Sequence, residues 1–356
     1  MSESRVGQVP SRVGHSKTGR SSSAVQSDTV LNVVIPALER TASLGTAGLM
    51  DALNKADRAG SLSGDPALSR LFEVRLIGRT RKIVRCRDGV QLVPSATAAG
   101  IAIPDLVVVP GLDDDLDSSF ELNRPWVPWI ARWHAAGARI ASSCTGAFLL
   151  ADAGVLAGKP ATTHWMFADE LQQHYPSVDV LADRMIIDTG DVITSGGATA
   201  FLNLVLYLVE RFGGHARANI AAKVLLVDGH QPSQLPYVAA SPGRAHDDVV
   251  IHEIQQHIDT HLDEPLQTTK LASEFGLSSR SLHRRFTAAT GHGPHVYLQR
   301  IRVRNAQRLL ETTSEPIDQI RRNVGYHDPA AFRRAFKQVT GLSPNGYRNR
   351  YGPRSG

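Results

Sequence analysis

Residues 271–291 constrain the fold most, because they read as two short helices joined by a tight turn. Apolar residues recur at the 3,4 spacing of one helix face as far as Phe275, and Gly276 stands where a helix commonly ends. Ser278 or Ser279 can cap a second helix, whose outer side carries cations. Such a pair predicts a helix-turn-helix, whose second helix can enter the DNA major groove. An ordinary helical hairpin explains a single copy equally well.

The same pattern returns about fifty residues later, between Ile317 and Gly341. Pro329 suits the first turn of the second helix in this later copy. Apolar residues over 294–312 predict one long helix between the two copies. The copies also end alike, since Leu282, Phe286, Thr290 and Gly291 match Phe332, Phe336, Thr340 and Gly341. The repetition predicts two DNA-reading modules on a rigid spacer.

The charge of the chain is divided unevenly. Residues 268–356 hold 16 Lys and Arg against 5 Asp and Glu, a net charge of +11. The rest of the chain holds 23 against 29, a net charge of −6. A basic domain beside an acidic one indicates that the basic part binds a polyanion.

The tandem pattern, which ends in GYHDPAAFRRAFKQVTGLSP, resembles the AraC/XylS family of transcription regulators over residues 249–347. The resemblance implies an all-α domain whose two recognition helices enter successive major-groove segments of double-stranded DNA. It also implies RNA polymerase as a partner and activation of transcription. Arginine can pair bidentately with guanine, whereas Pro329 and Ala330 would offer only apolar contact. Carried over by position, the DNA-binding candidates are Arg280, His283, Arg284, Pro329, Ala330, Arg333 and Arg334.

The first two thirds of the chain alternate short apolar runs with helical stretches. Strands are predicted at residues 30–35, 72–77, 106–109, 138–142 and 192–194. Helices are predicted at residues 46–59, 124–135, 145–153, 164–174 and 198–212. This order predicts an α/β sandwich with a mainly parallel sheet.

Residues 138–154 hold a strand that runs into a Cys-x-Gly turn at Cys144 and straight into a helix. This is the setting of a nucleophile elbow, where a helix N-terminus is expected to lower the pKa of the thiol. His164 follows twenty residues on as a candidate base. Together with residues 194–197, these features resemble the PfpI-type, class I amidotransferase-like domain, a flavodoxin-like sandwich. The pairing with two helix-turn-helix motifs resembles the GlxA-like subgroup of AraC regulators.

The resemblance implies that an enzyme of this kind would use Cys144 as nucleophile, His164 as its partner and an acid from the turn after the first strand. The helix register places Ala42 at the position of that acid, and Glu39 would replace it only if the register were off by three. We therefore expect no catalytic residues. We also expect no cofactor and no metal, because no histidine pair has metal-ligand spacing beside a cysteine. The candidates for lining a small-molecule pocket are Cys144, Thr145, His164 and Gly197, with an inert buried Cys144 as the alternative.

The domain order predicted from these features begins with a disordered tail over residues 1–28, which has no apolar run and no secretory signal. A sensor domain follows at 29–228, a Pro- and Gly-containing linker at 229–247 and the DNA-binding domain at 248–350. Two cysteines are too few for a disulfide scaffold, and no apolar run is long enough for a membrane span. A cytoplasmic protein is expected.

The sequence thus predicts a dimeric, sequence-specific transcription regulator that responds to an unknown small-molecule effector. Two alternatives stay open. One is a Cys-dependent amidase or deglycase fused to a DNA-binding domain. The other is a constitutive DNA-binding protein whose sensor domain only dimerises.

Overall fold

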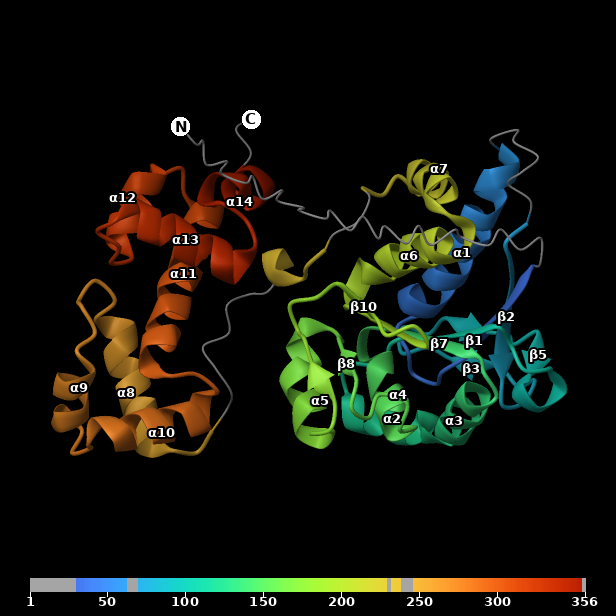
Figure 1. The fold of residues 1–356 in the computed structure, drawn as a ribbon, viewed down its shortest axis with the longest axis horizontal. Coiled ribbons are helices and arrows are strands. Elements are labelled where there is room, and N and C mark those ends of the chain that lie inside the picture. The colour runs from blue at the N-terminus through green and yellow to red at the C-terminus, as the bar shows by residue number, and fades with distance from the viewer. Residues whose placement is uncertain (1–29, 63–69, 229–231, 238–245, 354–356) are drawn as a thin grey trace, which may run out of the picture.

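The computed structural model describes residues 30–62, 70–228, 232–237 and 246–353. They form an α/β lobe and a helical lobe (Figure 1). The tail predicted at residues 1–28 lies outside the described residues. No helix within the described ranges combines the length and the apolar composition that crossing a membrane requires.

A seven-stranded sheet in the order β10-β11-β7-β6-β1-β2-β5 forms the centre of the α/β lobe. Only the pairing of β10 with β11 is antiparallel within it, so the predicted mainly parallel sheet is confirmed. Its strands are β1 (Leu31–Pro36), β2 (Phe72–Gly78), β5 (Ala96–Thr97), β6 (Leu106–Val109), β7 (Arg139–Ser143), β10 (Ile186–Asp188) and β11 (Val192–Ser195). Two small ribbons pair β3 (Val84–Arg85) with β4 (Gln91–Leu92) and β8 (Pro160–Ala161) with β9 (Asp179–Val180).

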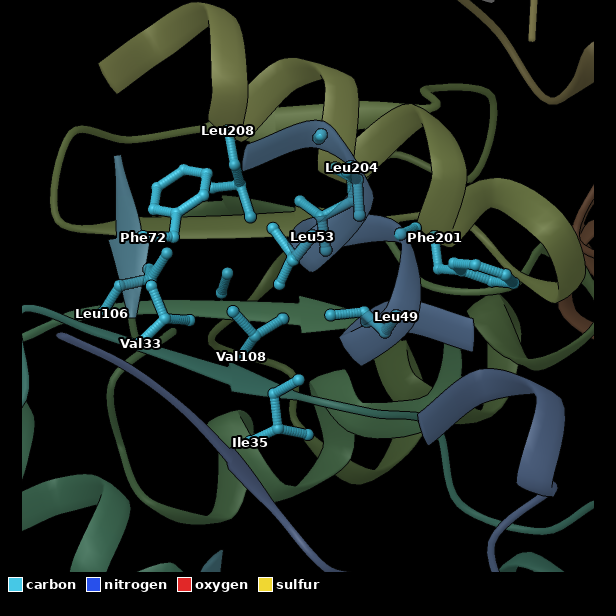
Figure 2. Packing of buried hydrophobic residues seen from close by; sticks show 14 of the residues in the cluster. Val33, Ile35, Leu49, Leu53, Phe72, Leu106, Val108, Phe201, Leu204 and Leu208 are labelled. Atoms are coloured by element: carbon cyan, nitrogen blue, oxygen red, sulfur yellow. The ribbon is translucent and has the colours of Figure 1, made fainter. Parts of the chain in front are cut away.

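Helices cover both faces of this sheet. Successive strand residues point to opposite sides, so the apolar side chains of each strand need cover on both faces. Val33 packs into the cluster that contains Phe72 and Leu204 (Figure 2), whereas Val34 packs into the cluster of Trp126 and Trp133. The first face carries α1 (Ser43–Leu62), α6 (Phe201–Gly213) and α7 (His215–Leu225). The second carries α2 (Leu116–Asn123), α3 (Val127–Ala135), α4 (Ala147–Asp152) and α5 (Ala168–His174).

The helical lobe has two cores, one for each copy of the sequence pattern. Leu282 and Phe286 belong to the first core, and Phe332 and Phe336 belong to the second. The long spacer helix passes from one core to the other, and its bounds are those predicted from the sequence. The helices are α8 (Val249–Thr260), α9 (Thr268–Glu274), α10 (Ser279–Thr290), α11 (Pro294–Thr312), α12 (Ile317–Asn323), α13 (Pro329–Thr340) and α14 (Pro344–Tyr351).

The ends of α10 and α13 are fixed by the same devices in both copies. The Ser278 side chain accepts a hydrogen bond from the N–H of Ser281, and Asp328 caps α13 in the same way. Both helices end at a glycine in the left-handed region, Gly291 with φ 78° and Gly341 with φ 73°. The repeated caps explain why α10 and α13 have the same length of 12 residues.

Candidate functional site

Strained backbone gathers at the carboxyl ends of the parallel strands. Arg40, Cys144 and Ala198 follow β1, β7 and β11, and their φ angles are 56°, 57° and 51°. The left-handed region is unfavourable for residues other than glycine, by about 1–3 kcal/mol, and such strain clusters at ligand and active sites. This edge of the sheet is therefore the candidate site of the α/β lobe.

The Cys144 thiol lies in a tight backbone cradle. A Cβ added to Gly111 would stand 2.9 Å from the Cys144 Cβ, so only glycine allows this approach. Burial raises the pKa of the Cys144 thiol, and hydrogen bonds from the backbone N–H groups of Thr145 and Ala198 offset this only in part. The lowered thiol pKa expected from the helix N-terminus is therefore wrong. The six residues of α4 supply little dipole against this desolvation.

His164 stands beside Gly197. Its Nδ1 accepts a hydrogen bond from the N–H of Met166 at 3.1 Å, which leaves the ring proton on Nε2. Burial lowers the pKa of the imidazole. A Cβ added to Gly197 would lie 1.6 Å from the His164 ring. Within the described part of the chain, the imidazole makes no hydrogen bond to Cys144.

The acid that such chemistry would need is not supplied by Glu39. The Glu39 carboxylate accepts from the backbone N–H of Arg85 at 3.3 Å, away from the thiol. Among the carboxylates, Asp114 acts on both groups: it adds to the raised pKa of Cys144 and opposes the lowering of the His164 pKa, in each case less strongly than burial acts. Sequence reasoning missed Asp114, although three consecutive aspartates directly beyond a buried strand could have pointed to it.

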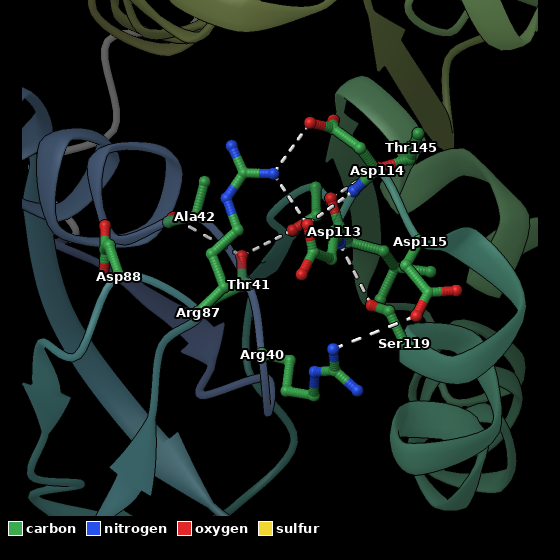
Figure 3. A network of polar contacts seen from close by, with 12 residues as sticks. Arg40, Thr41, Ala42, Arg87, Asp88, Asp113, Asp114, Asp115, Ser119 and Thr145 are labelled. Carbon is green, nitrogen blue, oxygen red and sulfur yellow. Dashed lines mark hydrogen bonds and ion pairs between the residues drawn. The ribbon is translucent and has the colours of Figure 1, made fainter.

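An ion-pair network holds Asp114 in the loop after β6 (Figure 3). Arg87 Nη1 contacts Asp113 at 2.6 Å and Asp114 at 2.7 Å, and the backbone N–H of Arg87 donates to the Thr41 carbonyl. The Thr41 hydroxyl donates to the Gly111 carbonyl at 2.5 Å. The network thus ties the turn after β1 to the loop that covers the thiol.

A small cavity of about 110 Å³ opens next to this cradle. Of the four predicted pocket residues, His164 and Gly197 line it. Cys144 does not line it, but its thiol accepts a hydrogen bond from the N–H of the lining residue Ala198. Thr145 is buried, and its hydroxyl donates to the Leu112 carbonyl at 3.1 Å. The sequence did not point to the rest of the wall, which is formed by Trp165, Met185, Ala198, Thr199, Ala200, Asn203, Gln234 and Tyr237.

The predicted DNA-binding residues lie on one outward face of α10 and one of α13. Arg280, His283 and Arg284 of α10 are exposed, as are Pro329, Arg333 and Arg334 of α13, with Ala330 half-buried. By contrast, Arg285 of α10 turns inward to Asp248, with nitrogen–oxygen distances of 3.1 and 2.8 Å. Among the described residues, no group of three or more His, Cys, Asp or Glu side chains is placed to hold a metal ion.

The raised thiol pKa predicts slow alkylation of Cys144 by iodoacetamide at neutral pH, because the thiolate is the nucleophile. The rate should rise about tenfold per pH unit until the pH passes the thiol pKa. In Asp114→Asn the profile should move to lower pH, because Asp114 raises that pKa. Peptide mass spectrometry separates Cys144 from Cys86, whose pKa is raised to about 11. Fast alkylation of Cys144 in the wild-type protein at pH 7 would contradict a raised thiol pKa.

Comparison with known proteins gives two sequence-model matches. The DJ-1/PfpI family matches residues 32–211, and a helix-turn-helix domain matches residues 271–350. The chain is 29% identical over 224 residues to the HTH-type transcriptional regulator GlxA of Rhizobium meliloti (strain 1021), which covers 63% of this chain and 69% of the relative.

Two other relatives differ in kind. The HTH-type transcriptional regulator GbdR of Pseudomonas aeruginosa (strain UCBPP-PA14) is 26% identical over 302 residues, which cover 83% of this chain and 79% of that protein. The isonitrile hydratase of Pseudomonas putida is 31% identical over 188 residues, 50% of this chain and 74% of the enzyme. The chain therefore belongs to the DJ-1/PfpI family and joins that family's α/β domain to a C-terminal AraC-type helix-turn-helix domain, the architecture of a DNA-binding transcription regulator.

Proposed function

We propose that the protein is a sequence-specific transcription regulator whose α/β lobe binds a small effector and whose helical lobe binds double-stranded DNA. The observation that carries the proposal is the pair of outward faces on α10 and α13, two helices that pack with successive halves of the single helix α11. Two arginine-bearing helices on one spacer support simultaneous reading of two major-groove segments. The net charge of +11 over residues 268–356 supports the phosphate contacts of such a complex.

Selection of bound duplexes from a random pool by the full chain tests this function. We expect enrichment of a site with two half-sites about 10 base pairs apart, centre to centre, because that spacing brings the groove back to the same DNA face. Binding should weaken steeply with salt as phosphate contacts are lost. Recovery of unrelated duplexes with equal affinity would contradict sequence-specific binding.

The effector pocket that we propose is the cavity beside His164 and Gly197. Its strained neighbours Cys144 and Ala198 support a ligand site, because strain of this kind is kept where it serves binding. An effector would regulate only by binding one arrangement of the lobes better than another. The relatives named as HTH-type transcriptional regulators support a regulatory function for this protein.

Further parts of the proposal concern domain limits, assembly and partners. We assign the sensor domain to residues 29–228 and the DNA-binding domain to 248–350. Dimerisation through the sensor domain would let two weak half-sites act as one strong site. We also propose activation through RNA polymerase, which the helix-turn-helix match of the helical lobe supports. A DNA-binding protein works in the compartment that holds the DNA, which for the bacterial relatives is the cytoplasm.

The rival function is a cysteine-dependent enzyme, which the isonitrile hydratase relative favours. The raised pKa of the buried Cys144 thiol and the hydrogen bond of the Glu39 carboxylate to the Arg85 backbone oppose it. We expect no turnover of amides, glycated amines or isonitriles above the level of Cys144→Ser. Product formation is followed by chromatography for both proteins at equal concentration. Turnover that the serine substitution abolishes would establish the enzyme instead.

A further inference from the structure

The short segment 232–237 lies between the two lobes, within the stretch predicted as a linker. In Figure 1 it is the yellow-gold turn beside the grey trace, with η6 (Leu235–Tyr237) as its helical part. Residues 229–231 and 238–245 of that stretch lie outside the described residues. Gln234 is only 3% exposed, which is unusual for a polar residue in a connecting segment. The segment is therefore docked, and its contacts can be followed in both directions.

Toward the α/β lobe, Gln234 is held as an anchor. Its Oε1 accepts from the N–H of Gly197 at 3.3 Å. A Cβ added to Gly196 would lie 2.5 Å from the Gln234 amide carbon, so the amide fills the space that this glycine leaves. Buried amide groups persist only when they are hydrogen-bonded. The amide nitrogen meets that condition, with acceptors at Thr163 O (2.9 Å), Arg184 O (3.0 Å), Ala182 O (3.1 Å) and Thr162 Oγ1 (3.2 Å).

Toward the helical lobe, the next three residues contact the end of the second recognition helix and the helix after it. A Cβ added to Gly341, which terminates α13, would lie 3.5 Å from Leu235 Cβ and 3.6 Å from Pro236 Cδ. The Tyr237 hydroxyl accepts a hydrogen bond from Arg350 of α14, whose guanidinium lies 4.9 Å from the Tyr237 ring centroid. The arginine thus stacks on the same ring that closes one side of the effector cavity.

We infer that residues 232–237 are an interdomain latch that holds the second DNA-reading module against the wall of the effector cavity. The inference rests on the proposed function. Gly197 is the shared element, because its N–H holds Gln234 while its Cα faces the His164 ring. A ligand that moves His164 or takes the Gly197 N–H competes directly with Gln234. Loss of the Gln234 anchor releases Tyr237 and, with it, α14.

A cross-linking experiment on the full chain tests the docked arrangement. The pair Leu235→Cys and Gly341→Cys should form a disulfide under diamide, because the Cβ separation of 3.5 Å lies at the short end of the usual range of about 3.5–4.5 Å. The matched control is Leu235→Cys with Gly291→Cys, since Gly291 ends α10 with a φ of 78°, close to that of Gly341. Peptide mass spectrometry identifies the bridge. Equal cross-linking of both pairs, or of neither when both fold, would overturn the inference.

A second measurement keeps the inference testable if the cysteine variants do not fold. In Gln234→Ala, hydrogen exchange over residues 341–351 should speed up by roughly fivefold or more, because the latch no longer restrains this end of the lobe. The equivalent residues of the first module, 291–301, should exchange as in wild type. Unchanged exchange over 341–351 would overturn the latch. Neither measurement uses DNA or effector, so failure here is distinct from failure of the selection for a DNA site.

Discussion

Replacing Arg284 or Arg334 with alanine should weaken binding to the selected DNA site by about 1–3 kcal/mol each, because each change would remove the bidentate base contact that we propose for that arginine. Both side chains are exposed at matching places on α10 and α13. The ion pair of Arg334 with Asp328 spans 3.9 Å with the arginine side chain 74% exposed, so it does not hold the arginine away from DNA. The double variant should lose roughly the sum of the two single losses, because the sites are in separate modules.

The measurement is competition between the selected duplex and a scrambled duplex at fixed salt. Arg308→Ala is the matched control, because Arg308 is an exposed arginine of the spacer helix α11 and belongs to neither recognition helix. It should reduce affinity for both duplexes alike or leave it unchanged. If Arg284→Ala and Arg334→Ala kept wild-type discrimination, the recognition-helix assignment would have to be abandoned.

Gly197→Ala should destabilise the α/β lobe by about 1–3 kcal/mol, the usual range for an overpacked site. The backbone at Gly197, with φ −94° and ψ 179°, is one that alanine adopts readily. The effect therefore comes from the His164 ring, 1.6 Å from the added methyl group. The ring would have to leave the cavity wall, so the variant should also lose its effector response.

A double-mutant cycle isolates this contact. In the background of His164→Gly, adding Gly197→Ala should have little effect on the free energy of unfolding, because both the ring and the Cβ of His164, which would lie 1.6 and 2.5 Å from the methyl group, are gone. Urea denaturation of the four proteins gives the coupling energy, which should equal most of the loss in the single variant. Full destabilisation in the His164→Gly background would show that the close approach to His164 is not the cause.

Helices α9 to α13 of the helical lobe were predictable from the sequence because their signals are local, whereas α8 and α14 were not predicted. The apolar periodicity of α11 and the cap at Ser278 depend only on residues close together in the sequence. In the structure, both the helix and the cap lie where the pattern predicts them. In the α/β lobe, the same holds for β6, a continuous apolar run buried on both faces. The two-residue strand β5 at the edge of the sheet was missed, because Ala96 and Thr97 give no periodic signal.

The cavity was less predictable, because its chemistry depends on contacts between distant parts of the chain. Asp114 acts on Cys144 and His164 across the ends of neighbouring strands. Gln234 reaches the same site from more than thirty residues beyond Gly197. From the sequence, Gln234 in its Pro- and Ser-rich stretch is expected to be a solvated linker residue. In the fold, four hydrogen-bond acceptors surround its amide nitrogen. The thiol pKa was misjudged for a related reason, since burial is a property of the packed lobe.

The length of the spacer helix α11 also fixes the distance between the two DNA-reading modules. Its 19 residues span about 28 Å at 1.5 Å per residue, a little less than the roughly 34 Å of one B-DNA turn. Mutations of individual bases in an operator would each change the affinity of the protein for that operator gradually. A one-base-pair insertion between the half-sites would rotate one of them away from its module, and α11 cannot stretch to follow. Operators of this protein are therefore expected to differ in base sequence while the spacing between their two half-sites stays constant.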